Sequence, residues 1–414
     1  MGEWPGWRCE EAGTSFFTQM INAYHRRNKQ MSVLIDNRDA WAPDVIDTAV
    51  VPRPYPNRTG RLPWDKDDMT AERLTGLLQN KYPGIVVEDL VVHQFIDSHT
   101  SKLRIAVKLN DVGVKAGIPE RLCIKSNYSG LHDNVDICAI EARFYHFMAH
   151  LMKCPTVTCY YADWDDDGSG QGLIILEDLE KYGGHFGQST DLNGVAEVAK
   201  LLEGLAVLHG SLWGSPVLDE HEWLQTSMDT PIDNDQIRIM WPYIEANLAD
   251  PEVCKVIPQK LIDDPDRLQR AFDKLAEWEL SQTTPRCVNL GDCHQGNTYR
   301  KPDGERIWLD WQLVRKGRPW RDLTYLMIGA LTIEERRASE RQLLSHYREA
   351  LVATGARDVP DLDSIFEQYR RWVIYGMQAW IANMDFWGQV GLPMNERFFT
   401  AGEDLGTWKL LLGD

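Results

Sequence analysis

The sequence predicts an α+β fold with two lobes, the first rich in strands and the second mainly helical. Three observations support this prediction. Short β-branched runs separated by polar breaks follow one another from residue 85 to residue 128. From about residue 190 onward, apolar residues recur with helical spacing. One strand-like stretch at 286–312 interrupts those helices and contains many polar residues.

The chain begins with an extension, residues 1–65, that we expect to lie outside the two lobes. Within it, residues 15–30 have helical spacing, whereas residues 42–64 contain five prolines and are typical of an extended connector. Two roles fit this extension: it covers a cleft between the lobes, or it mediates formation of a homodimer.

The strand-rich lobe is predicted to span residues 66–180. Thr70 precedes a run with helical spacing and is a suitable N-cap, because its hydroxyl can accept a hydrogen bond from an unpaired backbone N–H. Strands are predicted at 85–95, 102–111, 120–128 and 173–179, and a helix at 136–153. Asp163, Asp165 and Asp167 resemble the start of a calcium loop, but Ile174 stands where the closing Glu is needed, so an acidic hairpin turn is favoured.

The helical lobe is predicted to span residues 181–414. Its clearest helix is 192–210, with Asp191 as the expected N-cap, and helices resume at 320. Five aromatic residues recur near helical spacing, which is typical of a packed core and also of an aromatic pocket wall. They are Trp372, Tyr375, Trp380, Phe386 and Trp387.

Composition excludes several classes of protein. The net charge of −18 argues against nucleic-acid binding, which needs clustered Lys and Arg. No run approaches the roughly 18 apolar residues of a membrane span, and the first residues match neither a signal peptide nor a myristoylation site. The eight cysteines form no CxxC pair. We therefore expect a cytoplasmic protein with reduced cysteines.

The strongest functional pattern lies in the strand-like stretch within the helical lobe. Asn289-Leu-Gly-Asp-Cys-His-Gln-Gly-Asn297 forms a polar loop, and the apolar run that follows ends in Asp310. Phosphoryl transfer needs such groups, because one carboxylate orients and deprotonates the attacking hydroxyl while an Asn and a second carboxylate hold Mg²⁺. The pattern therefore favours a phosphotransferase.

This pattern resembles the aminoglycoside-phosphotransferase-like family, which includes choline- and ecdysteroid-kinase-like proteins. The family signature reads roughly H-G-D-x-H-x-x-N, followed by a strand that ends in D. Gly291, Asp292, His294, Asn297 and Asp310 match it in order and spacing. The resemblance implies a protein-kinase-like fold that uses ATP. It also implies that Asp292 is the catalytic base, that His294 organises the loop, and that Asn297 and Asp310 bind Mg²⁺.

Features of the strand-rich lobe fit the same family. Lys125 ends a predicted strand, and the resemblance implies that it reaches the α- and β-phosphates of ATP while Glu141 pairs with it. The strand at 173–179 resembles the family's connection between the lobes. Glu177 and Leu179 are placed there, where backbone groups would meet the adenine ring.

Two residues of the helical lobe, His209 and Asp322, fall in segments that also resemble the family. For both we favour a structural role, in which they fix helix ends and loops.

Two departures from the family pattern stand out. Leu290 occupies the position of the first His of the signature. The phosphate-covering turn should lie at 96–102, yet this segment contains no glycine. Backbone N–H groups can still bind phosphate there, with hydroxyls from Ser98, Thr100 and Ser101.

The sequence thus predicts an ATP- and Mg²⁺-dependent kinase that phosphorylates a hydroxyl of a small molecule. A sterol- or terpenoid-like alcohol is favoured by the tryptophan-rich helical lobe. An amino alcohol, an aminoglycoside and a hydroxyacyl thioester remain alternatives, and ATP is not distinguished from GTP. The rival hypothesis is a pseudokinase that binds nucleotide or acts as a scaffold, supported by the glycine-free turn and Leu290.

Overall fold

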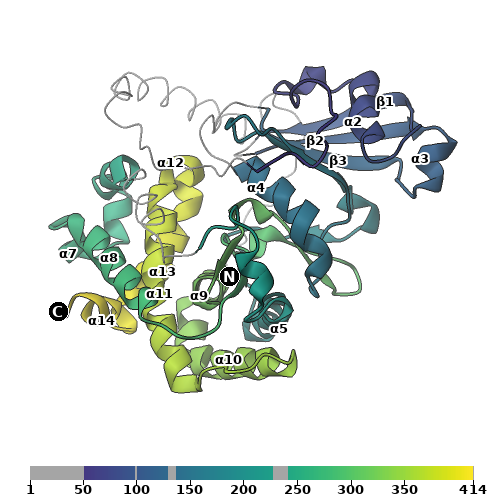
Figure 1. The fold of residues 1–414 in the computed structure, drawn as a ribbon. Coiled ribbons are helices and arrows are strands. Elements are labelled where there is room, and N and C mark those ends of the chain that lie inside the picture. The colour runs from purple at the N-terminus through teal and green to yellow at the C-terminus, as the bar shows by residue number, and fades with distance from the viewer. Residues whose placement is uncertain (1–50, 98–99, 129–136, 227–240, 414) are drawn as a thin grey trace, which may run out of the picture.

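The computed structural model describes residues 51–97, 100–128, 137–226 and 241–413, which form two lobes (Figure 1). The predicted helix at 15–30 and the predicted phosphate ligand Ser98 lie outside these residues. In the figure the strand-rich lobe, coloured purple to blue, stands above a larger lobe of green and yellow helices.

The strand-rich lobe is built on a five-stranded antiparallel sheet with the order β1-β2-β3-β5-β4. Its strands are β1 (Val87–Ile96), β2 (Ser101–Leu109), β3 (Arg121–Ser126), β4 (Cys159–Trp164) and β5 (Gly172–Glu177). Four of these strands were predicted, and β4 was not. Its apolar pattern is broken by Asp163, which is fully buried and neutralised by Arg58 at 2.6 Å. The acidic hairpin turn predicted after β4 is confirmed.

The two faces of this sheet differ in character. Residues that alternate along β2, such as Leu103 and Ile105, join a small core with α2 (Ala71–Gln79). Thr70 caps α2 as predicted, its hydroxyl accepting a hydrogen bond from the Arg73 N–H at 3.1 Å. The intervening residues of β2 point to the opposite face, on which Lys102 is half-buried and Lys108 is exposed.

Residues 51–65 pack against the strand-rich lobe. Arg58 forms ion pairs with Asp163 and Asp165, both at 2.6 Å, and Tyr55 stacks on Tyr161 with ring centroids 5.0 Å apart. This part of the predicted extension therefore contributes to the packing around β4.

Helical structure links the sheet to the larger lobe. The helix predicted at 136–153 begins as α4 (Ile137–Arg143), continues as one π-helical turn (Phe144–Met148) and ends as a 3₁₀ turn (Ala149–Leu151). The short α3 (Asp111–Lys115) joins β2 to β3. Further 3₁₀ turns occur at Lys66–Asp68, Leu179–Tyr182, Pro216–Asp219, Val253–Lys255, Gln295–Asn297, Trp311–Leu313 and Gly388–Gly391.

The helical lobe packs α5 against α10, and α11 against α9 and α13. Its helices are α5 (Val195–Ser211), α7 (Gln259–Ile262), α8 (Asp266–Leu280), α9 (Trp320–Ala330), α10 (Ile333–Ala353), α11 (Leu362–Ala382), α12 (Met384–Trp387), α13 (Leu392–Asp404) and α14 (Thr407–Leu412). The prediction that Asp191 caps this helix is wrong, because α5 begins after Gly194. The Asp191 carboxylate instead accepts a hydrogen bond from the Gln188 N–H at 3.0 Å. No helix in the described part of the chain is long and apolar enough to cross a membrane.

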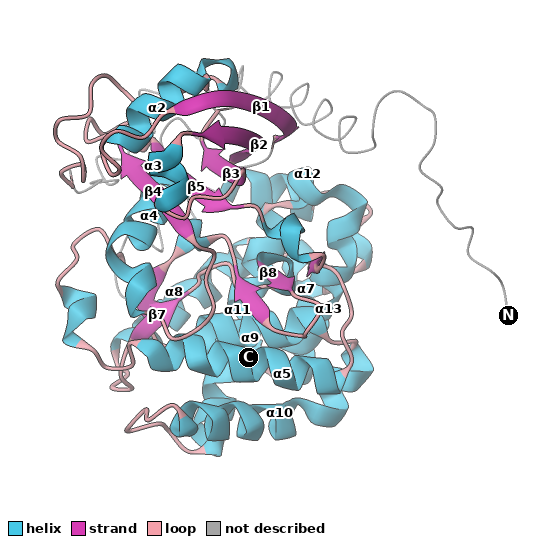
Figure 2. Cartoon of the chain, turned by 90° about the vertical axis from the view of Figure 1, so that its right-hand side faces the viewer, coloured by secondary structure: helices cyan, strands magenta, loops and turns pink. Residues whose placement is uncertain are grey.

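The strand-like interruption predicted at 286–312 consists of short strands between the helices and the upper sheet (Figure 2). β7 (Cys287–Asn289) pairs with β10 (Arg315–Gly317). β8 (Thr298–Arg300) pairs with β9 (Arg306–Trp308) and with β6 (His185–Phe186). The two-lobed α+β fold predicted from the sequence is confirmed, and these strands hold the polar loop between the lobes.

Candidate active site

The candidate active site is centred on the loop that follows β7. Gly291 has φ = +90°, and a Cβ added there would lie 1.8 Å from the Leu313 carbonyl oxygen. Only glycine avoids both problems, because it has no Cβ and adopts positive φ without strain. The close approach of the two backbones places Asp292 beside the segment that follows Asp310.

Three predicted residues of this loop lie together. The Asn297 amide nitrogen donates hydrogen bonds to the Asp292 carbonyl at 2.8 Å and to its carboxylate at 3.4 Å. His294 Nε2 lies 3.4 Å from Asp292 Oδ2. Burial alone would raise the pKa of Asp292, but the nearby His294 ring holds that pKa below its usual value. The carboxylate is therefore kept ionised, as a proton acceptor must be.

Asp310 lies at the end of the β8–β9 hairpin in a left-handed backbone conformation, with φ = 61° and ψ = 62°. Asp and Asn tolerate this region better than most residues, and outliers of this kind concentrate at functional sites. The hairpin is tied to the loop of Asp292, since the Leu309 N–H donates to the Asn297 carbonyl at 2.9 Å. Asn297 and Asp310 are thus held by one short hydrogen-bonded unit.

Lys125 connects the two lobes through two carboxylates. Its ammonium lies 2.5 Å from Glu141 Oε2 and 2.6 Å from Asp310 Oδ1. The second Glu141 oxygen accepts a hydrogen bond from the Trp311 N–H at 3.1 Å. Burial alone would lower the pKa of Lys125, but Asp310 and then Glu141 hold it above its usual value. Conversely, Lys125 keeps the pKa of Asp310 below the usual value despite burial. Lys125 and Asp310 therefore favour each other's charged form, whereas burial raises the pKa of Glu141, whose ionised form depends on the Lys125 ammonium beside it.

Asp322, on α9, fixes the backbone on the amino-terminal side of Asp292. Its two carboxylate oxygens accept hydrogen bonds from the N–H groups of Leu290, at 2.6 Å, and Gly291, at 3.1 Å. His209 lies 3.5 Å away and contacts Tyr347 at 2.7 Å. Leu290, where the family has His, is fully buried in the core. Hydrogen bonds to its backbone thus hold the loop, and the Leu290 side chain packs in the core.

Aromatic residues of the helical lobe surround the other side of the loop. The Tyr375 hydroxyl donates to the Gly291 carbonyl at 3.0 Å and accepts from Arg321 at 2.7 Å. The ring centroids of Tyr325 and Trp380 lie 6.2 Å and 6.5 Å from that of His294. Among the aromatic residues noted in the sequence, Trp372, Tyr375 and Trp380 are buried, whereas the side chain of Phe386 is not described. Some of these rings therefore border the candidate site.

The predicted phosphate-covering turn reaches the same site. The Thr100 hydroxyl donates to Gln312 Oε1 at 3.1 Å, two residues after Asp310. The Ser101 hydroxyl instead lies 3.3 Å from the Asp97 carboxylate, within the turn itself. Of the three hydroxyls expected to face phosphate, those of Thr100 and Ser101 are thus engaged with protein groups, and Ser98 lies outside the described residues.

Glu177 and Leu179 lie at the predicted connection between the lobes. The Glu177 carboxylate is buried and accepts hydrogen bonds from the Thr158 N–H at 3.1 Å and the Tyr182 hydroxyl at 2.9 Å. The Leu179 carbonyl accepts from the Tyr299 hydroxyl at 2.8 Å, which links this connection to β8. The Glu177 side chain is thus engaged within the connection, and that of Leu179 packs in the core. The prediction that this segment meets the adenine ring therefore concerns its backbone groups.

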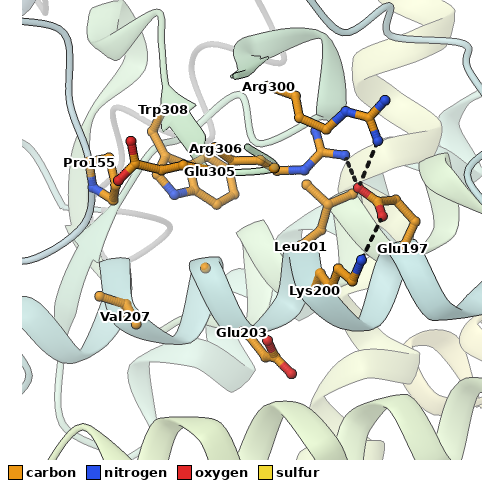
Figure 3. A pocket seen from close by; sticks show the side chains of 12 residues that line it. Pro155, Glu197, Lys200, Leu201, Glu203, Val207, Arg300, Glu305, Arg306 and Trp308 are labelled. Atoms are coloured by element: carbon orange, nitrogen blue, oxygen red, sulfur yellow. Dashed lines mark hydrogen bonds and ion pairs between the residues drawn. The ribbon is translucent and has the colours of Figure 1, made fainter. Parts of the chain in front are cut away.

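A separate hollow of about 380 Å³ lies between the β8–β9 hairpin and α5 (Figure 3). Trp308 and Gly204 line it, and Glu197 within it pairs with Arg306 at 2.6 Å. None of the predicted site residues borders this hollow.

Two residues near the site, Lys102 and Arg321, were not predicted from the sequence to belong to it. Lys102 lies on β2 directly opposite Lys125. Arg321 bonds Tyr375, as described above, and also helps to lower the pKa of Asp292. The strand register could have identified Lys102, since the positions on either side of it are apolar or small and point the other way.

Comparisons with known proteins give a family and a fold. The sequence model of the ecdysteroid kinase-like family matches residues 142–357, a range that contains Asp292, Asn297 and Asp310. A search of curated proteins finds no match.

Three solved structures illustrate the likeness of fold. A Ralstonia eutropha protein described as an aminoglycoside phosphotransferase has 14% identity and a TM-score of 0.52, covering 80% of this chain and 98% of its own. A choline kinase from Streptococcus pneumoniae has 14% identity and a TM-score of 0.47, over 78% and 94% of the two chains. A macrolide 2'-phosphotransferase from Brachybacterium faecium has 14% identity and a TM-score of 0.44, over 80% and 97%. Only the first comparison, which has a TM-score above 0.5, supports the two-lobed kinase-like fold.

Proposed function

The chain belongs to the ecdysteroid kinase-like family, and we therefore propose that it is an ATP- and Mg²⁺-dependent kinase acting on a hydroxyl of a small molecule. One observation carries the proposal. Asp292, Asn297 and Asp310 lie in one hydrogen-bonded unit, and Lys125 joins that unit to Glu141 across the lobe interface. These are the groups that positioning and charge neutralisation in phosphoryl transfer require.

The residues present fit a magnesium ion. Asn297 and Asp310 offer an amide and a carboxylate oxygen, the ligand types that Mg²⁺ prefers. Asp310 pairs with a cation in this structure, the Lys125 ammonium at 2.6 Å, and this contact supports its assignment to a site for positive charge. When bound, the ion would be held by Asn297 and Asp310 and would neutralise negative charge on the phosphates.

The remaining chemistry falls to the side chains. The acceptor oxygen forms a bond to the γ-phosphorus of ATP, while the bond from that phosphorus to the β–γ bridging oxygen breaks and ADP leaves. The hydroxyl proton passes to Asp292, whose lowered pKa keeps it ready to accept a proton. Lys125 binds the phosphates, and Asp310 and Glu141 favour its charged form.

The acceptor we favour is an apolar, ring-containing alcohol. Its support is the aromatic group beside His294, in which Tyr325 and Trp380 are buried and stand against the catalytic loop. Large aromatic side chains bind apolar rings through buried area. Amino alcohols, aminoglycosides and hydroxyacyl thioesters form the comparison set for experiment.

The pseudokinase hypothesis loses one of its two arguments. The catalytic loop does not need a His at position 290, because Asp322 holds the backbone there. The glycine-free turn remains its one supporting observation.

The test is ADP release with Mg²⁺-ATP across sterols, amino alcohols, aminoglycosides and hydroxyacyl thioesters. We expect turnover with one class, and a fall in kcat of about 10²–10⁴-fold in Asp292→Asn, because a positioned general base contributes that much. Asp166→Asn, the same substitution in the exposed β4–β5 turn, should leave kcat unchanged. Nucleotide binding without turnover on any acceptor would favour the pseudokinase.

A further inference from the structure

Two lysines face each other on neighbouring strands of the upper sheet. In the antiparallel pair of β2 and β3, Lys102 is the Cα partner of Lys125. Directly opposed residues project from the same face of a sheet. Leu103 and Ile124, each next in sequence to one of these lysines, belong to the core on the other face. Both lysines therefore point toward the helical lobe and the candidate site.

Charged groups of both signs lie close to these two lysines. Lys125 is held by Glu141 and Asp310, as described above. Burial, followed by repulsion from Lys125, lowers the pKa of Lys102, whereas Asp310 acts in the opposite direction. The Lys102 ammonium donates to the Thr100 carbonyl at 3.4 Å. Glu141 and Asp310 pair with Lys125, and an anion bound beside both lysines would further favour the charged form of Lys102 against its burial and the repulsion from Lys125.

The turn before Lys102 is poorly suited to bind phosphate alone. The glycine-free segment contributes the carboxylate of Asp97, which repels phosphate. The hydroxyls of Thr100 and Ser101 are engaged with Gln312 and Asp97. Lys102, immediately after the turn, can supply the phosphate-binding group that the turn lacks, because charge-assisted hydrogen bonds to phosphate are among the strongest.

We propose that Lys102 is a second phosphate-binding lysine of the nucleotide site, acting beside Lys125 in place of a glycine-rich turn. This inference rests on the proposed kinase function and specifies how its nucleotide is held. Lys102 acts on the phosphates and makes no contact with the base, so its contribution depends on the number of phosphates the ligand carries.

The experiment compares the binding of ADP and adenosine, measured by calorimetry, in four proteins. These are the wild type, Lys102→Met, Lys102→Arg and Lys108→Met. Lys108 is the matched control, because it lies on β2 with its side chain 74% exposed and pairs with Glu88 at 2.9 Å. We expect Lys102→Met to weaken ADP binding about ten- to hundredfold, as for loss of one charged hydrogen bond. Adenosine binding should be unchanged, Lys102→Arg should retain most of the ADP affinity, and Lys108→Met all of it.

Each contrary result has a distinct meaning. Equal ADP affinity in Lys102→Met and wild type would overturn the inference and leave the kinase proposal intact. Parallel losses for ADP and adenosine would overturn it in favour of a structural role for Lys102. A wild type that binds neither ligand would overturn the kinase proposal and this inference together.

Discussion

At the scale of single residues, Asp322 fixes the backbone position of the loop that carries Asp292. Its carboxylate accepts the N–H groups of two consecutive residues just before Asp292. An Asn at 322 would turn a donor toward one of those N–H groups. We expect Asp322→Asn to lower the free energy of unfolding by about 1–3 kcal/mol, the usual effect of leaving a buried polar group unsatisfied. The kcat should fall as well.

The measurements are urea unfolding and steady-state turnover of the same preparations. Asp363→Asn is the control, because that side chain is 86% exposed and its pairing with Arg341 lies at the surface. If Asp322→Asn matched the wild type in both measurements, the account of how the loop is held would be wrong.

At the scale of secondary-structure elements, a hydroxyl of α11, that of Tyr375, is hydrogen-bonded to the loop that carries Asp292. Tyr375 donates to the Gly291 carbonyl and accepts from Arg321 of α9, so one oxygen joins two helices to the loop. Tyr375→Phe keeps the ring and removes both hydrogen bonds. We expect kcat to fall at least several-fold while stability changes by about 1–2 kcal/mol.

Tyr369→Phe provides the comparison on the same helix. Its hydroxyl lies 3.3 Å from the Glu340 carboxylate, away from the loop. We expect kcat to fall in Tyr375→Phe and to stay unchanged in Tyr369→Phe. Equal kcat values for the two variants would show that α11 does not position the loop.

At the scale of the whole molecule, the lobes meet through Lys125–Asp310, Glu141–Trp311 and Thr100–Gln312. A ligand that binds both lobes must stabilise the native protein by mass action. At a hundred times its Kd, Mg²⁺-ADP should add about 2.7 kcal/mol to the free energy of unfolding. We expect a rise in Tm with Mg²⁺-ADP that exceeds the rise with ADP alone.

That difference should vanish in Asp310→Asn and persist in Asp303→Asn, a variant of the exposed hairpin turn. Thermal unfolding followed by fluorescence provides the readout. A Mg²⁺-dependent rise in Tm that survived in Asp310→Asn would remove Asp310 from the set of metal ligands.

The parts of the fold and site that were predicted correctly depend on residues close together in sequence. The parts that were missed depend on contacts between residues far apart in sequence. The loop from Gly291 to Asn297 could be identified because its groups lie close in sequence and a short hairpin brings Asp310 back to them. β4 could not, because its buried Asp163 is acceptable only with Arg58, a partner about 100 residues earlier. Lys102 was overlooked because a lysine alternating with apolar residues is usually on a solvent-exposed face.

The N-cap of α5 was misplaced for a related reason. Asp191 is a good helix-capping residue by type, but it is used in a turn with Gln188, and its carbonyl accepts a hydrogen bond from the Gln295 side chain. The competing partner lies in the catalytic loop, which the periodicity of a single helix cannot reveal.

The left-handed backbone at Asp310 has an evolutionary consequence. Only Gly, Asn and Asp adopt that conformation with little strain, so most replacements would disturb the hairpin as well as remove a carboxylate. Asn and Gly are also reached from Asp by a single nucleotide change. A lineage that abandoned turnover would therefore pass most easily through Asn or Gly at this position. Such descendants would keep the fold, and the identity of residue 310 would distinguish them from active relatives.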